Sequence, residues 1–240
     1  MIPFDRLTAL FLDLGNTLVS IDFAWVRDEL DQRGVSATES ELQRAEAAAR
    51  PSVSRAVRQT GNSEGGDAFH RYLTAVLGGV ASAAAMSDRE RDDFCAELAT
   101  VLRVPGQTHR LWSNLLPGVR QTLEAFHRAG LPVVVVSNSD GSAADIVDRQ
   151  GLRDLVRGVV DSHVIGIEKP DRGIFDHALA LVGASPGTVL HVGDIYDVDV
   201  VGACGAGLHA MLIDPYGDWP DVDCARIASI AELPGLILAA

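Results

Sequence analysis

Short apolar runs alternate with helical patterns along much of this chain, and this alternation limits its fold more than any other feature. Helical patterns cover residues 118–130, 142–151 and 171–183. The apolar runs have the length and composition of strands buried on both faces, and they lie at 8–14, 131–139, 158–166, 188–194 and 209–214. Strands and helices in this order predict right-handed βαβ units. We therefore predict an α/β fold in three layers, with a parallel sheet between two layers of helices.

A long insertion interrupts the alternation after the first predicted strand. Residues 24–115 are charged, rich in alanine and helical in period, with glycines as breaks. The segment is far longer than a βα loop, for which about 2–6 residues is usual. We therefore predict two domains, an all-α domain at 20–115 and an α/β core formed by 1–19 together with 116–240.

Charge and composition exclude several classes of function. The chain has 33 acidic and 20 basic residues and a formal net charge of -13, which disfavours nucleic acid or an anionic membrane as a partner. Its three cysteines form no CxxC pair, and no apolar run has the length of a membrane span or the flanks of a signal peptide. We therefore expect a cytoplasmic protein that binds neither nucleic acid nor membrane. The oligomeric state has no signal in the sequence.

Polar side chains gather where the predicted strands end. Asp13 closes the first strand, Ser137 and Asn138 close the second, and Asp194 closes the fourth. Lys169, the only lysine of the chain, follows the third. Ligands of open parallel sheets bind beyond the carboxyl ends of the strands, so we expect these side chains to meet at one site.

The residues at these strand ends are suited to phosphoryl transfer. An aspartate such as Asp13 can attack phosphorus and form an aspartyl phosphate that water then hydrolyses. Mg²⁺ prefers carboxylate and phosphate oxygens, which suits Asp13 with Asp194 and Asp199. The Ser137 hydroxyl and the Lys169 ammonium would hold phosphoryl oxygens and offset their negative charge. Together these residues predict a magnesium site that binds a small phosphorylated substrate.

Four segments resemble the motifs of the haloacid dehalogenase (HAD) superfamily of phosphohydrolases, in the family's order. They are DLGNTL at 13–18, VVVVSN at 133–138, EKPDRGIF at 168–175 and GDIYDVDVVGACGAG at 193–207. The set covers both halves of the predicted core and is far more specific than any one motif. The resemblance implies a Rossmann-like core, and it makes the all-α domain at 20–115 a helical cap domain.

The resemblance also implies roles for individual residues. Asp13 would be the nucleophile, and Lys169 would steady both Asp13 and the phosphoryl group. Ser137 would be the phosphate-binding hydroxyl, with Asn138 and Thr17 as further candidates, although the Thr17 hydroxyl is equally suited to satisfying turn amides. The metal candidates are Asp13, the backbone carbonyl of Gly15, Asp194, and Asp199, which would support either the metal or the lysine.

Gly15 departs from the family's pattern. The family has a second aspartate two residues after the nucleophile, and that aspartate protonates the leaving group and then activates water. Glycine keeps the backbone carbonyl and loses this acid and base. A leaving group that departs readily as an anion needs no proton, so Gly15 favours acyl or aryl phosphates over alkyl phosphates. Gly15→Asp is expected to raise activity towards alkyl phosphates.

The function predicted from the sequence is Mg²⁺-dependent hydrolysis of a small phosphorylated compound through an aspartyl phosphate on Asp13. Two alternatives remain open. A 2-haloacid dehalogenase-like hydrolase releases a halide, which needs no acid, although Asp194 and Asp199 favour a metal. A catalytically weak member of the family would instead bind a phosphorylated ligand or a protein partner.

Overall fold

Six parallel strands form the central sheet of the protein. The computed structural model describes residues 2–60, 66–104, 106–219 and 221–239. The strand order is β5-β4-β1-β6-β7-β8, and every neighbouring pair is parallel. The strands are β1 (Ala9–Leu12), β4 (Val133–Ser137), β5 (Gly158–Asp161), β6 (Val189–Gly193), β7 (His209–Ile213) and β8 (Ala225–Ile227).

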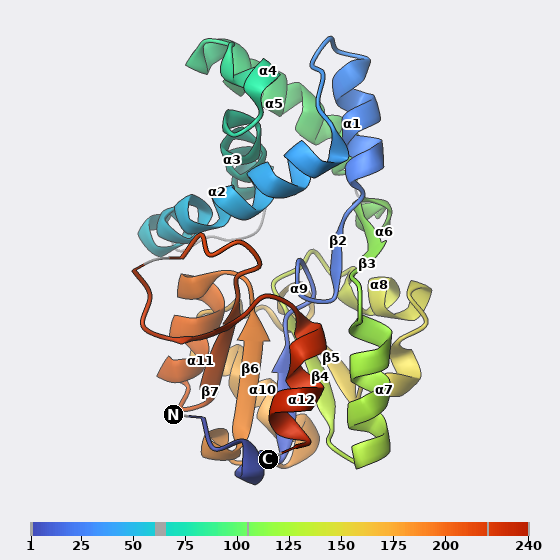
Figure 1. The fold of residues 1–240 in the computed structure, drawn as a ribbon, viewed down its shortest axis with the longest axis vertical. Helices are drawn as coiled ribbons and strands as arrows, with labels where there is room; N and C mark the ends of the chain where they lie inside the picture. Colours follow the sequence, from blue (N-terminus) through green and yellow to red (C-terminus); the bar gives the residue numbers. More distant parts are fainter. Residues whose placement is uncertain (1, 61–65, 105, 220, 240) are drawn as a thin grey trace.

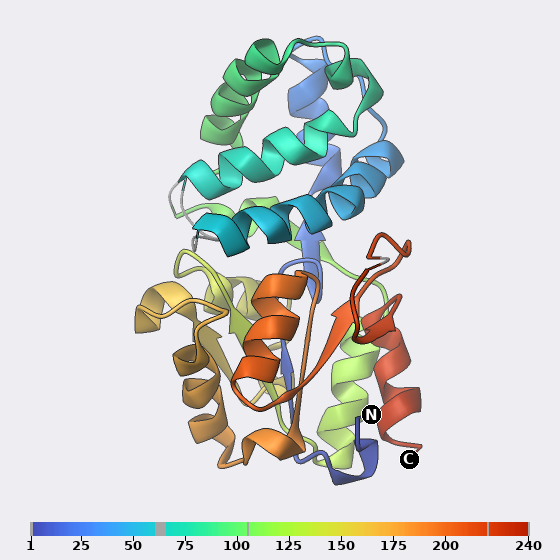
Figure 2. The ribbon, with the colours of Figure 1, turned by 90° about the vertical axis from the view of Figure 1, so that its left-hand side faces the viewer.

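Helices cover both faces of this sheet (Figures 1 and 2). Leu10 and Leu12 of β1 pack into one apolar layer with α7 (Val119–Ala129), α8 (Ala143–Arg149) and α12 (Leu233–Ile237). Ala9 and Phe11 pack into the other layer, with α10 (Arg172–Val182) and α11 (Val201–Gly205). Successive residues of a strand point to opposite faces, so a strand between two helical layers is apolar throughout. The prediction of a three-layer parallel core is confirmed.

Two features of the core differ from the predicted elements. The apolar run 158–166 is a strand only to Asp161, where α9 (Ser162–Ile165) begins, because the Asp161 carboxylate accepts a hydrogen bond from His163 N at 3.0 Å and caps the helix. Strand β8 was not predicted, since its three residues are too few to show a pattern. Short helical turns lie at Phe4–Arg6, Arg153–Leu155, Pro186–Thr188 and Ile230–Glu232, with a π-helical turn at Tyr196–Val200.

The helices within residues 22–111 form a separate group, here called the helical segment, beyond the carboxyl end of the sheet (Figure 1). A hydrophobic cluster of its own, from Ile21 to Leu111, holds it together. Its helices are α1 (Phe23–Asp31), α2 (Glu39–Thr60), α3 (Gly66–Gly78), α4 (Ala81–Ala84), α5 (Asp88–Leu102) and α6 (Thr108–Leu111). None of the helices in the described parts of the chain has the length and apolar character that a bilayer span requires.

A two-stranded antiparallel ribbon joins the helical segment to the core. It consists of β2 (Val19–Ile21) and β3 (Trp112–Leu115). The helical pattern predicted for residues 24–115 therefore ends before Trp112, because the last four residues pair with β2. The predicted domain boundaries, at 19–20 and 115–116, lie at these two strands.

Candidate active site

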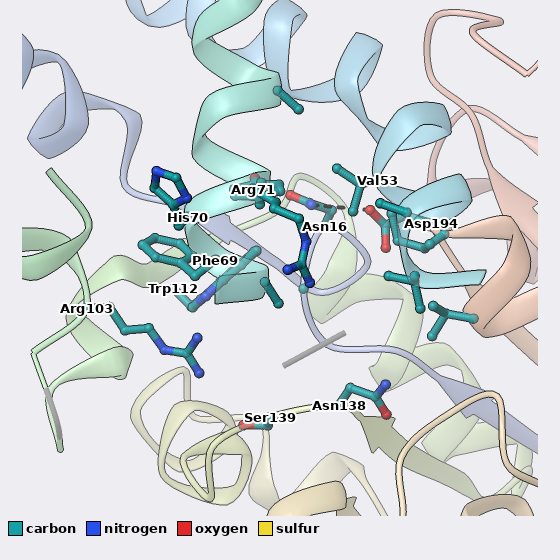
Figure 3. A pocket seen from close by; sticks show the side chains of 18 of the residues that line it. Asn16, Val53, Phe69, His70, Arg71, Arg103, Trp112, Asn138, Ser139 and Asp194 are labelled. Carbon is teal, nitrogen blue, oxygen red and sulfur yellow. Dashed lines mark hydrogen bonds between the residues drawn. The ribbon is translucent and has the colours of Figure 1, made fainter. Parts of the chain in front are cut away.

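The predicted strand-end residues line one cavity. It has a volume of about 580 Å³ and is bounded by the carboxyl ends of the strands and by the helical segment (Figure 3). Asp13 directly follows β1 and Ser137 ends β4. Asp194 directly follows β6, and Lys169 lies in the loop between α9 and α10. The parallel topology thus brings together residues that are far apart in the sequence.

Lys169 lines this cavity, with its ammonium between two carboxylates. Its Nζ donates to Asp13 Oδ1 at 2.6 Å and to Asp199 Oδ1 at 2.7 Å, and the side chain is almost completely buried. Burial alone would lower the pKa of Lys169, but the charges of the two carboxylates raise it above its usual value. The lysine therefore stays protonated and fixes one oxygen of Asp13.

Asn138 holds the backbone of Lys169 in place. Its Oδ1 accepts from Lys169 N at 2.7 Å, and its Nδ2 donates to Lys169 O at 2.8 Å. From the sequence, this amide is a candidate for phosphate contact. Its geometry shows an additional structural role, since two hydrogen bonds fix the loop that carries the lysine.

Asp199 is fully engaged by protein groups. Besides the bond from Lys169, Oδ1 accepts from His191 Nε2 at 2.9 Å, and Oδ2 accepts from Ile195 N at 3.0 Å. Burial would raise the pKa of Asp199, but the charge of Lys169 and the hydrogen bond from His191 lower it below its usual range. A Cβ on Gly193 would lie 2.1 Å from Asp199 Cγ, so only glycine fits there. Of the two roles expected for Asp199, its contacts favour support of the lysine.

Three carboxylates could together hold a metal ion. Ligand oxygens of Asp13, Asp194 and Asp199 all lie within 4.8 Å of one another. Burial raises the pKa of Asp13 to about 6 and that of Asp194 well above its usual value, and neighbouring carboxylates add to both shifts. A hard divalent cation would relieve this repulsion, so the donor set fits Mg²⁺. Gly15 lines the same cavity, but its carbonyl as a ligand stays a prediction.

A buried ion pair of the helical segment contacts Asp194. On α2, Arg50 Nη2 lies 2.6 Å from Glu46 Oε2, and Arg50 Nε lies 3.3 Å from Asp194 Oδ2. Asn16 Nδ2 joins the group, donating to Asp194 Oδ2 at 3.2 Å (Figure 3) and to Glu46 Oε1 at 2.9 Å. Glu46 is 2% exposed and Arg50 7%. The helical segment thus supplies a positive charge to a candidate metal ligand.

This ion pair could not be found from the sequence. Arg50 and Glu46 stand among many charged residues of a helical pattern, where a solvent-exposed face is the usual outcome. Their spacing of four residues indicates a pair on one helix face, but not that the pair is buried. His191 was missed for a related reason, since one histidine in an apolar strand gives no sign of its partner.

The indole of Trp112 occupies the space beside Gly15. A Cβ built on Gly15 would lie 3.1 Å from Cζ3 and 3.2 Å from Cη2 of this ring. Such contacts are tighter than ordinary packing allows, so a side chain at position 15 requires the indole to move. With the indole of Trp112 in this place, position 15 has room for a glycine but not for the aspartate that the resemblance implies.

The two candidate hydroxyls lie differently. Ser137 is buried, lines the cavity, and donates to the carbonyl of Asn138 at 3.2 Å. Thr17 is completely buried and does not line the cavity, and its Oγ1 has no hydrogen-bond partner among the residues that the structure describes. The geometry therefore places Ser137, and not Thr17, where a phosphate could reach it.

Comparisons with known proteins agree with this arrangement. Residues 7–207 match the model of the family described as haloacid dehalogenase-like hydrolase. Haloacid dehalogenase-like hydrolase domain-containing protein 3 of Xenopus laevis is 30% identical over 187 residues, which are 78% of this chain and 75% of the frog protein. The bovine protein of that name is 38% identical over 100 residues, 42% of this chain. The chain spans only 40% of the length of that bovine relative.

A phosphatase and a solved structure extend the comparison. Ribulose-1,5-bisphosphate 5-phosphatase of Halopiger xanaduensis is 31% identical over 103 residues, which are 42% of this chain and 43% of that protein. A HAD phosphatase from Thermococcus onnurineus shares the fold with a TM-score of 0.59 and 19% identity, over 96% of this chain and 98% of that one. With a family model that matches 7–207 and includes all four motif segments, this chain belongs to the haloacid dehalogenase-like hydrolases.

Proposed function

We propose that this protein is a Mg²⁺-dependent phosphatase that hydrolyses a small phosphorylated compound through an aspartyl phosphate on Asp13. The observation that supports this most strongly is the contact of Lys169 with Asp13 in a cavity large enough for a small substrate. The likeness to proteins named as phosphatases agrees with it.

The nucleophile is the Asp13 oxygen that Lys169 does not hold. This carboxylate oxygen forms a bond to phosphorus while the bond from phosphorus to the ester oxygen breaks. Lys169 keeps the carboxylate oriented, and the Ser137 hydroxyl binds a phosphoryl oxygen. Mg²⁺ held by Asp13 and Asp194 would supply charge stabilisation to the phosphoryl oxygens. Water then attacks phosphorus and releases phosphate, which restores Asp13.

The helical segment acts as the cap of this site and determines which substrates enter. It contributes residues to the lining of the cavity, among them Val53, Phe69 and Arg71 (Figure 3). Closure of such a cap excludes water and completes the site. We also keep the division into a core of 1–19 with 116–240 and a cap of 20–115, and a cytoplasmic location, as predictions.

The leaving group determines which phosphates are hydrolysed well. Position 15 has no carboxylate, and general acid catalysis contributes about 10²- to 10⁴-fold. We expect the ratio of kcat/KM for phenyl phosphate to that for ethyl phosphate to exceed the ratio of their uncatalysed hydrolysis rates in water by about 10²-fold or more. Initial rates of phosphate release from the two esters measure this preference. If the enzyme accelerates the hydrolysis of both esters equally over their rates in water, another group supplies the proton.

The missing carboxylate at position 15 can be restored only if the indole of Trp112 makes room for it. We expect Gly15→Asp alone to lower the free energy of unfolding by about 1–3 kcal/mol, because its side chain meets the indole of Trp112. Gly15→Asp combined with Trp112→Leu removes this contact and is expected to raise ethyl phosphate turnover above that of Trp112→Leu alone. Urea denaturation and ethyl phosphate assays of the three variants check both points. An unchanged rate in a folded double variant would contradict a proton donor at position 15.

A substrate screen with and without Mg²⁺ tests the proposed function. We expect phosphate release from aryl phosphates with Mg²⁺ and its loss after treatment with EDTA. The rival function is dehalogenation, which Gly15 favours because a departing halide needs no proton. Release of halide from 2-chloropropionate without metal, and no phosphate release, would establish that rival. Tight binding of a phosphorylated compound without turnover would indicate a binding protein.

A further inference from the structure

Three arginines of the helical segment line the cavity. One of them, Arg91, is paired with Asp88. Of the other two, Arg71 lies on α3, and Arg103 directly follows α5. Both side chains extend into the cavity from the helical segment, across the cavity from Asn138 (Figure 3).

No ion pair or hydrogen bond of Arg71 is found within the described parts of the chain. Arg103 lies over the ring of Phe69, with Cζ 5.7 Å from the centroid, and its Nη2 is 4.0 Å from Asp140 Oδ2. Among the described residues no carboxylate pairs with Arg71, so its guanidinium brings a positive charge to the cavity.

This charge is unexpected in its surroundings. The chain has a net charge of -13, and the cavity lining includes Asp13, Asp194 and Asp199 beyond the strand ends, together with Asp92 and Asp140. Lys169 does not provide free positive charge, because it is paired with two of them. An arginine that lines a cavity and has no ion-pair partner among the described residues is suited to a carboxylate or a phosphate, because two oxygens of either anion can accept parallel hydrogen bonds from its guanidinium.

Apolar side chains supply much of the remaining lining. They include Val53, Val57, Phe69, Trp112 and Ile146. A volume of about 580 Å³ is also more than a lone phosphoryl group needs, and it lies within the usual range of about 300–1,000 Å³ for pockets that enclose a whole small molecule. The cavity thus offers a phosphoryl site at the strand ends, apolar walls, and a cationic group from the helical segment.

We propose that the substrate is a phosphate ester with an apolar body and a second anionic group, which Arg71 binds with Arg103 beside it. The inference rests on the proposed phosphatase function and narrows its substrate class. The second group is a carboxylate or a second phosphate, since both offer the paired oxygens that a guanidinium binds. Arg71 acts here as a determinant of specificity and takes no part in the chemical step.

Three aryl phosphates with similar leaving groups test this class. They are phenyl phosphate, 3-carboxyphenyl phosphate and benzene-1,3-diyl bisphosphate, so that the last two separate the two kinds of anion. We expect the enzyme to prefer at least one of them over phenyl phosphate by about 10-fold or more in kcat/KM, after correction for the two equivalent esters of the bisphosphate. The preferred probe identifies the second anion.

Variants of Arg71 connect this preference to the residue. In Arg71→Gln the ratio of kcat/KM between the preferred probe and phenyl phosphate is expected to fall by about 10-fold, and Arg71→Lys, which keeps the charge, should retain part of it. Arg89→Gln is the matched control, because Arg89 is an exposed arginine of α5 outside the cavity. Unfolding temperatures of all variants show whether a lost preference reflects a lost fold.

The outcomes separate this inference from the proposed function. Hydrolysis of phenyl phosphate without preference for a second anion, or the same preference in a folded Arg71→Gln, would overturn the inference and leave the phosphatase in place. If none of the three probes is hydrolysed in the presence of Mg²⁺, the phosphatase function is contradicted, and the inference falls with it.

Discussion

Asp13→Asn is expected to reduce Mg²⁺-dependent hydrolysis of phenyl phosphate by about 10⁴-fold or more, because removal of a nucleophile eliminates the covalent route. The amide is nearly the same shape as the carboxylate but cannot form the acyl phosphate. Lys169 keeps its contact with Asp199, so its buried charge remains paired. Steady-state rates of phosphate release, measured beside the unfolding temperature, separate loss of chemistry from loss of fold.

A matched control for this variant is Asp176→Asn. Asp176 is an exposed aspartate on α10 that pairs with Arg172 on the surface and does not line the cavity. We expect its rate to equal that of the unchanged protein. A folded Asp13→Asn protein that still turns over phenyl phosphate at a comparable rate would assign the nucleophile to another group.

Arg50→Met is expected to lower the free energy of unfolding by about 3–5 kcal/mol, because it leaves the carboxylates of Glu46 and Asp194 buried without their cation. Burial opposes the charged form of Arg50, yet Glu46 and Asp194 raise its pKa above the usual value, so the guanidinium is charged in the folded protein. Urea denaturation at neutral pH measures the loss, provided that both variant and parent unfold in a single transition.

Arg44→Met provides a close comparison on the same helix. Arg44 Nη2 also pairs with a core aspartate, Asp218, at 2.7 Å, but its side chain is 48% exposed. An exposed pair of this kind contributes about 0–1 kcal/mol, so Arg44→Met should have little effect. Equal losses in the two variants would show that burial does not determine the strength of the Arg50 contacts.

Mg²⁺ connects this ion pair to the candidate metal site. If Asp194 is a metal ligand, bound Mg²⁺ replaces part of the positive charge that Arg50→Met removes. Saturating Mg²⁺ is therefore expected to raise the unfolding temperature of Arg50→Met more than that of Arg44→Met, since a ligand stabilises the state that binds it. An equal rise in both would place the metal away from Asp194.

Much of the core could be predicted because its strands are buried on both faces. Runs such as Val133–Val136 are apolar without interruption, and only a strand between two helical layers places every one of these residues in the core. Short elements gave no such signal. Strands β2 and β3 are three and four residues long and depend on pairing with each other across the helical segment.

The site residues that stand at the ends of strands could be predicted from the sequence. Those that depend on tertiary contacts could not. Asp13, Ser137 and Asp194 stand directly at the ends of predicted strands, so parallel topology alone places them at one edge. The contact of Trp112 with Gly15 and that of Arg50 with Asp194 join segments that no local pattern relates. Their positions depend on how the helical segment packs over the sheet.

Mass spectrometry of protein quenched in acid during turnover of phenyl phosphate tests whether Asp13 is the nucleophile. We expect one phosphoryl group per chain, attached to Asp13, that forms only with Mg²⁺ and is absent from Asp13→Asn. Steady release of phosphate with a phosphoryl group on another residue, or an Asp13→Asn protein that is labelled to the same extent, would contradict this role of Asp13.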